Sequence, residues 1–340
     1  MKSVRTQKCR NKVVFMLKYD EQRFKNICTR GDYNQVVVYL SGLEDGKELL
    51  EKYKDIYENG AYFIKTKDER IGKFLRIYED YLKWALSNEV TTEECKEYIV
   101  NKLKGFFPRI KFYSVFSETF AWRALCFSVN RYFKKRGYFV TFGVTAPYPC
   151  LYLWGKETVR KEMVELPEGT AEIDVREMDE TVTKGWLDYL SMNKVGAGGW
   201  VTKKGSNYFK DKYDTDSDEF KISLLKHEGQ HFFDLKRHPK MKGTDLEYRA
   251  KLVELIYHKD MGTFFSFIER MAEEDDRTQP HAYANRKIVQ AMSERIFGYE
   301  MEKSHDLWAD KGEEIPQAAR KLLKEHSEKM NDWDGKSFVV

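Results

Sequence analysis

The hydrophobic positions along the chain follow a helical period in two stretches, with a strand-like period between them. Before about residue 136, apolar and aromatic residues recur at helical spacing, and the same spacing returns from about residue 219 to the end. The predicted helices cover residues 44–58, 66–87, 92–104, 113–135, 219–236, 244–258, 262–273, 282–302 and 316–331. Thr91 and Glu94 form the capping-box pattern that supports the start of the third of these helices.

The stretch between the two helical regions is rich in aromatic and β-branched residues and alternates in polarity. Its predicted strands cover residues 138–145, 150–154 and 171–178, followed by a glycine cluster at 196–201. Residues 36–40 are a short apolar run that fits a strand or a buried turn, and residues 205–218 are polar and predicted to be a loop.

The order of helices, then a small sheet, then helices predicts an α+β fold. We expect a mostly helical N-terminal domain over 1–136. The second domain, over 137–340, would hold a small mixed sheet and end in helices.

Composition fits a globular protein without a membrane span. Of 340 residues, 41% are hydrophobic and 34% are charged, and no apolar run approaches the roughly 18 residues that span a bilayer. The N-terminal run Val13–Leu17 is too short for the core of a signal peptide. Five scattered cysteines without a C-x-x-C pair are typical of reduced thiols, so we expect a cytoplasmic protein with no membrane partner. The oligomeric state is not encoded in any pattern that we find.

Two segments are locally basic although the net charge is only +4. Residues 1–30 and residues 101–136 each carry nine Lys or Arg, and the second segment also contains several aromatic residues. Surfaces that bind single-stranded nucleic acid have a similar composition. We favour the simpler interpretation, in which the aromatic residues form a core and the basic residues face water.

The strongest chemical signal is the sequence His227-Glu228-Gly229-Gln230-His231 within a predicted helix. On a helix, His227 and His231 lie one turn apart on the same face, where two imidazoles can bind one Zn²⁺. Glu228 follows at a position from which its carboxylate can reach a metal-bound water. The apolar neighbours Leu224, Leu225, Phe232 and Phe233 indicate that this helix is buried.

A zinc site needs at least one further protein ligand. Glu247 follows His231 after fifteen residues and would open the next helix, whose first turns can face the histidines. Thr244 and Glu247 also form a capping-box pattern, so Glu247 could instead cap its own helix. Glu254, two turns further on the same face, is the alternative third ligand.

Other ionisable residues near the motif are weaker candidates. Asp234 lies on the face of the two histidines, where it could accept the free ring N–H of one of them or simply be a surface acid. Asp245, His238 and His258 are also close enough in sequence to be considered as ligands.

The motif followed by a glutamate on the next helix resembles the zincin metallopeptidases, in particular the glutamate-liganded (gluzincin) branch that includes thermolysin. The resemblance covers roughly residues 137–260. It implies one Zn²⁺ per chain held by His227, His231 and Glu247, with Glu228 as general base. It also implies an edge strand that pairs with an extended substrate, for which residues 198–201 lie in the right order along the chain.

The sequence therefore predicts a zinc-dependent peptidase that acts on a peptide or protein substrate. Glu228 would take a proton from the metal-bound water and pass it to the leaving amine. His281, Tyr283 and Tyr248 are the candidate donors to the oxyanion, with His281 preferred. The alternative is a catalytically silent, zinc-stabilised regulatory or nucleic-acid-binding protein. No motif indicates which substrate is bound.

Overall fold

The computed structural model describes residues 18–58, 60, 62, 66, 68–110, 117–202, 205–274 and 276–340. Helices and one mixed sheet make up this part of the chain, so the predicted α+β class is confirmed. Within it, no helix combines the length and the apolar character needed to cross a membrane. The four described cysteines, Cys28, Cys95, Cys126 and Cys150, are free thiols. The basic segment 1–30 lies mostly outside the described residues.

The chain forms two compact units, each built from two separate segments. Unit 1 consists of residues 1–156 and 180–197, and unit 2 of residues 157–179 and 198–340. The sequence predicted a single boundary near residue 136. The division differs because two long strands continue from one unit into the other, so that the chain passes between the units more than once.

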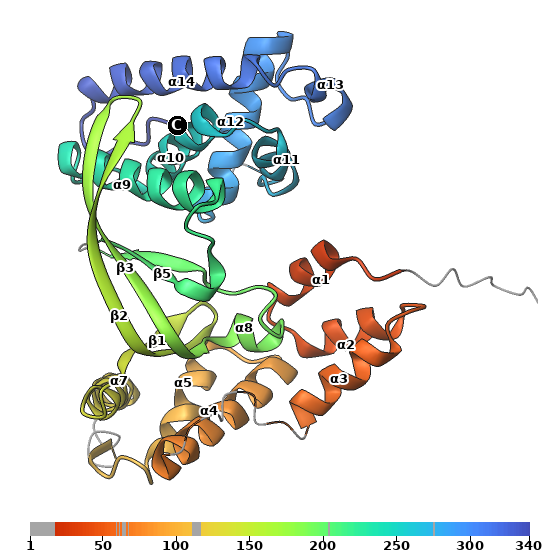
Figure 1. Cartoon of the computed structure of the whole chain (residues 1–340), viewed down its shortest axis with the longest axis vertical. Coiled ribbons are helices and arrows are strands. Elements are labelled where there is room, and N and C mark those ends of the chain that lie inside the picture. The colour runs from red at the N-terminus through yellow and green to blue at the C-terminus, as the bar shows by residue number, and fades with distance from the viewer. Residues whose placement is uncertain are drawn as a thin grey trace, which may run out of the picture. The chain divides into compact units, whose positions relative to one another are not determined.

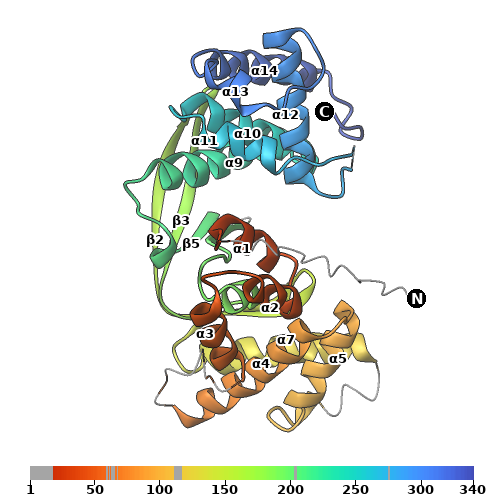
Figure 2. The same cartoon turned by 90° about the vertical axis from the view of Figure 1, so that its right-hand side faces the viewer.

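Unit 1 is mainly helical. The helices are α1 (Glu21–Cys28), α2 (Tyr33–Ser41), α3 (Lys47–Glu58), α4 (Glu69–Ser87), α5 (Thr92–Leu103), α7 (Glu118–Lys134) and α8 (Trp186–Leu190). Of these, α1, α2, α4, α5 and α7 begin at acidic or hydroxyl side chains that cap the first turn. Thr91 and Glu94 form the predicted capping box, and Asp68 accepts from the N–H groups of Arg70 and Ile71. Figure 2 shows α4 near α5, while α7 packs against α5 and against strand β1 (Phe139–Thr145).

One prediction in unit 1 was inaccurate. Residues 36–40, expected as a strand or turn, belong to α2, because Asp32 caps that helix and a helical face buries Val36 and Leu40. The helix predicted over 113–135 is seen as α7, and residues 111–116 lie outside the described part of the chain.

The sheet has the order β1-β2-β3-β5-β4, where β2 is Tyr148–Leu166, β3 is Gly169–Lys184, β4 is Gly199–Thr202 and β5 is Gly205–Phe209. β5 runs parallel to β3, with Val175 opposite Ser206, and β4 is antiparallel to β5 at the end of this order. The loop predicted over 205–218 is therefore wrong for its first five residues, all of which are buried. Gly205 permits this strand because a Cβ there would lie 1.9 Å from the carbonyl oxygen of Asp174.

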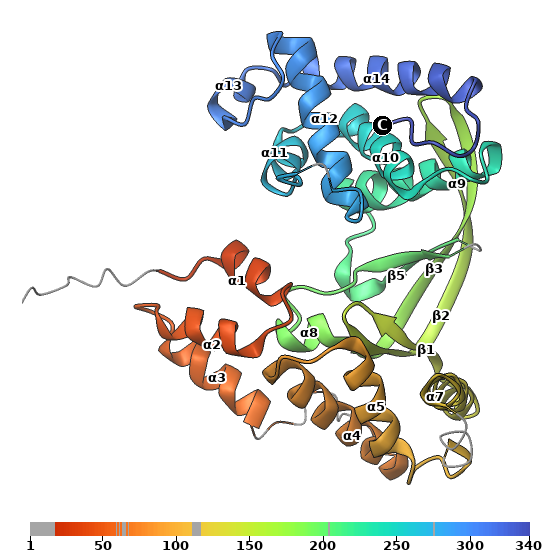
Figure 3. The ribbon, with the colours of Figure 1, turned by 180° about the vertical axis from the view of Figure 1, so that it is seen from behind.

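Unit 2 surrounds one central helix, α10 (Gly243–Tyr257), which contacts α9, α11, α12 and α14 (Figures 1 and 3). Leu252 and Val253 of α10 are fully buried within a core shared with β2, β3 and β5. The other helical segments are the short 3-10 helix η1 (Lys210–Lys212), η2 (Glu219–Lys226), α9 (His227–Arg237), α11 (Gly262–Glu269), α12 (Pro280–Phe297), α13 (His305–Ala309) and α14 (Glu314–Asn331). α13 and η1 were not predicted, and α12 ends earlier than predicted, at Gly298 in the left-handed conformation (φ 79°).

The segment that carries the two histidines is helical as predicted, but its first half is a π-helix. Residues of η2 form i→i+5 turns and lead directly into α9 at His227. π-Helical turns are rare and are frequent at functional sites. Phe220 and Leu224 of η2 belong to the unit 2 core immediately before the histidine motif.

Strand β2 lies against α9 at the glycine inside the motif. A Cβ on Gly229 would be 2.9 Å from Cγ1 and 3.1 Å from Cβ of Val164, and Val164 is a buried, stiff side chain. Gly229 is therefore the residue that lets the histidine-bearing helix approach the sheet.

Gly229→Ala should destabilise the protein, by a net of about 1–2 kcal/mol, because the overpacking penalty exceeds the gain in helix propensity. Denaturant unfolding of the wild type, the single variants and Gly229→Ala/Val164→Ala forms a double-mutant cycle that measures this. Val164→Ala should lower the unfolding free energy less in the Gly229→Ala variant than in the wild type. Additive effects would contradict a direct clash.

Candidate metal centre

Two imidazoles from α9 meet at the centre of the site. His227 and His231 are one turn apart, and their Nε2 atoms lie 3.0 Å from each other. The rings are nearly perpendicular, with their centroids 4.7 Å apart, and both side chains are largely shielded from solvent. The helical spacing predicted from the sequence therefore brings both Nε2 atoms to one point.

Glu247 approaches the same point from α10. Its Oε2 lies 3.5 Å from Nε2 of His227, and its Oε1 lies 3.4 Å from Nε2 of His231. Donor atoms of His227, His231 and Glu247 all lie within 4.8 Å of one another. The structure thus brings together the three residues predicted as ligands, and two imidazoles with one carboxylate are a donor set suited to zinc.

Glu254, the alternative third ligand, lies on the other side of the His227 ring. Its Oε1 accepts a hydrogen bond of 2.6 Å from Nδ1 of His227. A carboxylate in this position fixes the ring orientation and keeps a proton on Nδ1, so that Nε2 is the ring atom that faces Glu247 and His231. Glu254 therefore orients a candidate ligand and does not join the group of three.

Glu228 lies beside the group of three and is mostly buried. Its Oε2 is 4.0 Å from Nε2 of His231 and has no hydrogen-bond partner in the structure. Burial raises the pKa of this carboxyl group. An unpartnered buried oxygen at this place fits a base that accepts a proton from a water bound at the centre.

The electrostatics of the centre favour a cation. Burial by itself would lower the pKa of His227, but the contacts with Glu247 and Glu254 outweigh it and raise this pKa to about 10. Burial opposes the charge on Glu247, yet its contacts with His227, His231 and His281 hold the pKa of its carboxyl group well below the usual range. Two ionised carboxylates facing one imidazole leave a negative centre, which a proton or a metal ion can neutralise.

His281, the preferred oxyanion donor, comes from the first turn of α12 and lies at the rim of the centre. Its Nδ1 is 2.8 Å from Oε2 of Glu247, and 71% of its side chain is exposed. It is therefore a neighbour of a candidate ligand, and its role as a donor stays a prediction. The other two candidates are held elsewhere, because Tyr248 packs on the ring of His326 and the hydroxyl of Tyr283 contacts Arg277.

Asp234 neither contacts a ligand histidine nor faces solvent, so both interpretations of this residue were wrong. It is 1% exposed, and its carboxylate accepts from Nε of Arg249 at 2.9 Å and from Gln230. Arg249 also donates to Glu168, at the turn between β2 and β3, and to Ser327 of α14. This buried network joins α9 to α10 and both to the sheet.

The weaker candidates have structural roles. Asp245 accepts hydrogen bonds from the backbone of Val339 and Val340, and the ring of His238 lies near that of Trp333. His258 is 2.8 Å from the hydroxyl of Ser223 through its Nε2. None of these three joins the group of candidate ligands.

Sequence reasoning did not single out Tyr213, whose hydroxyl interacts electrostatically with Glu228. Burial, assisted by the carboxylates of Glu219 and Glu228, raises the pKa of its hydroxyl to about 12. It follows β5, in the segment that was predicted to be a loop, and no motif marks it. Its position depends on packing against Phe220 and Tyr208, which only the fold brings together.

Comparison of the chain with protein-family models, with curated proteins and with solved structures finds no match.

Asp234→Asn should lower the unfolding free energy of the metal-free protein by about 3 kcal/mol, because Arg249 stays buried with one of its charge partners removed. Glu172→Gln is the control, since Glu172 pairs with Lys161 on the surface and should cost about 0–1 kcal/mol. Thermal and denaturant unfolding measure both. Equal effects of the two substitutions would contradict a bracing role for the Asp234–Arg249 pair.

Proposed function

We propose that this protein is a zinc-dependent peptidase whose metal is held by His227, His231 and Glu247. The observation that carries the proposal is the convergence of these three donors within 4.8 Å, with Glu254 behind His227. A purely structural role for the cluster would leave Glu228 without a purpose. Its buried, unpartnered carboxylate oxygen beside the donors favours hydrolysis over a silent scaffold.

Zinc bound in such a site lowers the pKa of its water to about 7 and polarises a substrate carbonyl. The residues of this chain supply the remaining chemistry. Glu228 accepts the proton that the attacking water loses, because burial has already raised its affinity for a proton. The same carboxyl group then protonates the departing amine.

The sheet offers a place for an extended substrate. β4 ends the strand order and belongs to unit 2 together with the candidate metal centre. The outer side of a strand at the end of a sheet can hydrogen-bond to a peptide in the extended conformation, and this supplies affinity without requiring a particular peptide sequence. This supports a peptide as substrate, as the resemblance to zincins implies.

Metal content and activity should separate in two matched variants. Glu228→Gln should keep stoichiometric zinc and near-native stability, while peptidase activity falls by about 10²–10⁴-fold through loss of the base. Glu247→Gln should first weaken zinc affinity, with activity partly restored by excess zinc. Elemental analysis and assays on a mixed peptide library measure both properties.

The double variant His227→Ala/His231→Ala is the control for specific metal binding. Full zinc retained in this variant would end the proposal, as would wild-type protein whose zinc cannot be brought to stoichiometry. Zinc lost from Glu228→Gln but kept in Glu247→Gln would reverse the two assigned roles. Stoichiometric zinc without hydrolysis of any peptide would leave the silent regulatory alternative.

Zinc binding should strengthen as the pH rises. The contacts that hold the pKa of His227 near 10 keep a proton in the metal-free centre at neutral pH, and zinc must displace it. The apparent Kd should therefore fall about tenfold per pH unit between roughly pH 6.5 and 8.5 for one displaced proton. Competition with a chelator of known pH dependence measures this, and a Kd independent of pH would contradict proton displacement.

A further inference from the structure

The outer face of α7 in unit 1 carries a row of exposed cations and aromatic rings. Arg123, Phe127, Arg131 and Lys135 follow one another at i, i+4 spacing, and all four are exposed. The row is about 18 Å long at 1.5 Å per residue. Phe127 is 66% exposed, and Phe120 on the same helix is 56% exposed, which is unusual for rings of this size.

These rings line a hollow of about 530 Å³. Five cationic side chains surround it: Arg109, Arg123, Arg131, Lys135 and Arg136. Among the described residues no acidic side chain lines this hollow. Asp68 lies 3.8 Å from Nε of Arg136 and offsets that charge.

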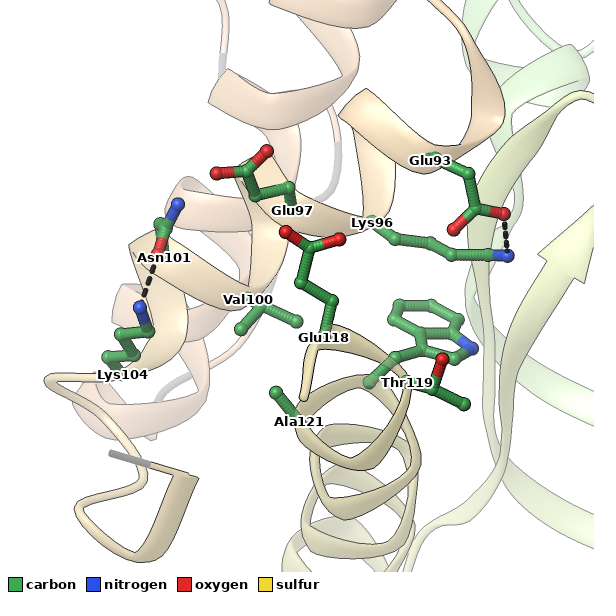
Figure 4. A pocket seen from close by; sticks show the side chains of 10 residues that line it. Glu93, Lys96, Glu97, Val100, Asn101, Lys104, Glu118, Thr119 and Ala121 are labelled. Atoms are coloured by element: carbon green, nitrogen blue, oxygen red, sulfur yellow. Dashed lines mark hydrogen bonds and ion pairs between the residues drawn. The ribbon is translucent and has the colours of Figure 1, made fainter. Parts of the chain in front are cut away.

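A second hollow, where α5 faces α7, is lined by more acidic than basic side chains. Figure 4 shows Glu97 and Glu118 directed toward the same space, while Lys96 is paired with Glu93. Its volume is about 270 Å³ and its lining carries three carboxylates against two lysines. A polyanion would be repelled there, so the two sides of α7 differ in the partner that they can accept.

Only part of the basic, aromatic segment behaves as the sequence interpretation expected. Phe106, Phe107, Tyr132 and Phe133 pack around Phe74 in the unit 1 core. Phe120 and Phe127 do not join this core. Arg136 stacks on Tyr132 at 3.7 Å from the ring centroid, which holds one guanidinium group at the edge of the hollow.

We propose that this face of α7 binds single-stranded nucleic acid, an activity separate from the metal centre. Single strands offer flat bases that stack on aromatic rings and phosphates that pair with Arg and Lys. Along α7 the cations stand on both sides of Phe127, which matches a polymer that alternates flat apolar groups with negative charges. An acidic peptide would satisfy the cations, but it has no regular series of flat groups for the open rings.

Fluorescence anisotropy with labelled single strands of about 12 nucleotides, on the full chain, tests this binding. Phe127→Ala should weaken binding about 5- to 150-fold through loss of one stacked base. Arg123→Gln/Arg131→Gln should reduce the slope of log K against log salt by about 1.4, or about 0.7 for each lost phosphate contact. A duplex of the same sequence should bind more weakly, because its bases are already stacked.

The matched control is Lys52→Gln/Lys54→Gln, which removes the same charge from exposed positions on α3. It should leave the affinity and the salt slope nearly unchanged. All substituted residues are exposed, and circular dichroism checks that each variant is folded. No binding of any single strand at low salt would overturn the proposal, as would binding that neither α7 variant weakens. Tighter binding of an acidic peptide than of the oligonucleotide would also overturn it.

Discussion

The hydrogen bond between His227 and Glu254 is the interaction on which the candidate centre depends most directly. It joins α9 to α10 in the buried part of unit 2, at 2.6 Å, and sets the direction of the one imidazole that faces both carboxylates. With Nδ1 committed to Glu254, Nε2 is left for the point where His231 and Glu247 meet. A buried carboxylate is costly unless it is paired, so each of these two glutamates needs the positive charge that the centre can hold.

This arrangement needs a fixed register between two helices, and the neighbouring ion pair supplies it. Asp234 is three residues after His231, and Arg249 is two residues after Glu247, so their contact lies close to the ligands on both helices. Arg249 extends the same network to Glu168 of the sheet turn and to Ser327 of α14. On the opposite side, Gly229 allows β2 to pack directly on α9. The geometry of the donors therefore follows from packing throughout unit 2.

Unit 1 shows how one helix can serve both a core and a surface. α7 buries Ala121, Leu125, Val129 and Phe133 at helical spacing, which is enough to hold it in place. Phe120 and Phe127 lie outside this stripe and remain exposed, and cations surround them. Exposing an aromatic ring to water costs free energy, so these exposed rings indicate a binding surface. Exposed polar residues carry no such information, because they are expected on any protein surface.

The sequence alone determined the periodic elements and the residues of the chemical motif. Helical spacing located all the long helices, because one apolar face per helix suffices to mark them, and the i, i+4 histidines fixed their own relation through helix geometry. The same local reasoning predicted Glu247 as a third donor. It could not exclude Glu254, because both residues lie on one face of α10. Only the tertiary structure decided that one carboxylate meets Nε2 and the other Nδ1 of His227. It likewise decided that Asp234 pairs with Arg249, that β5 joins the sheet, and that Phe127 stays exposed. Each of these depends on which distant segments pack together, and the local period of hydrophobic residues carries no information about that choice.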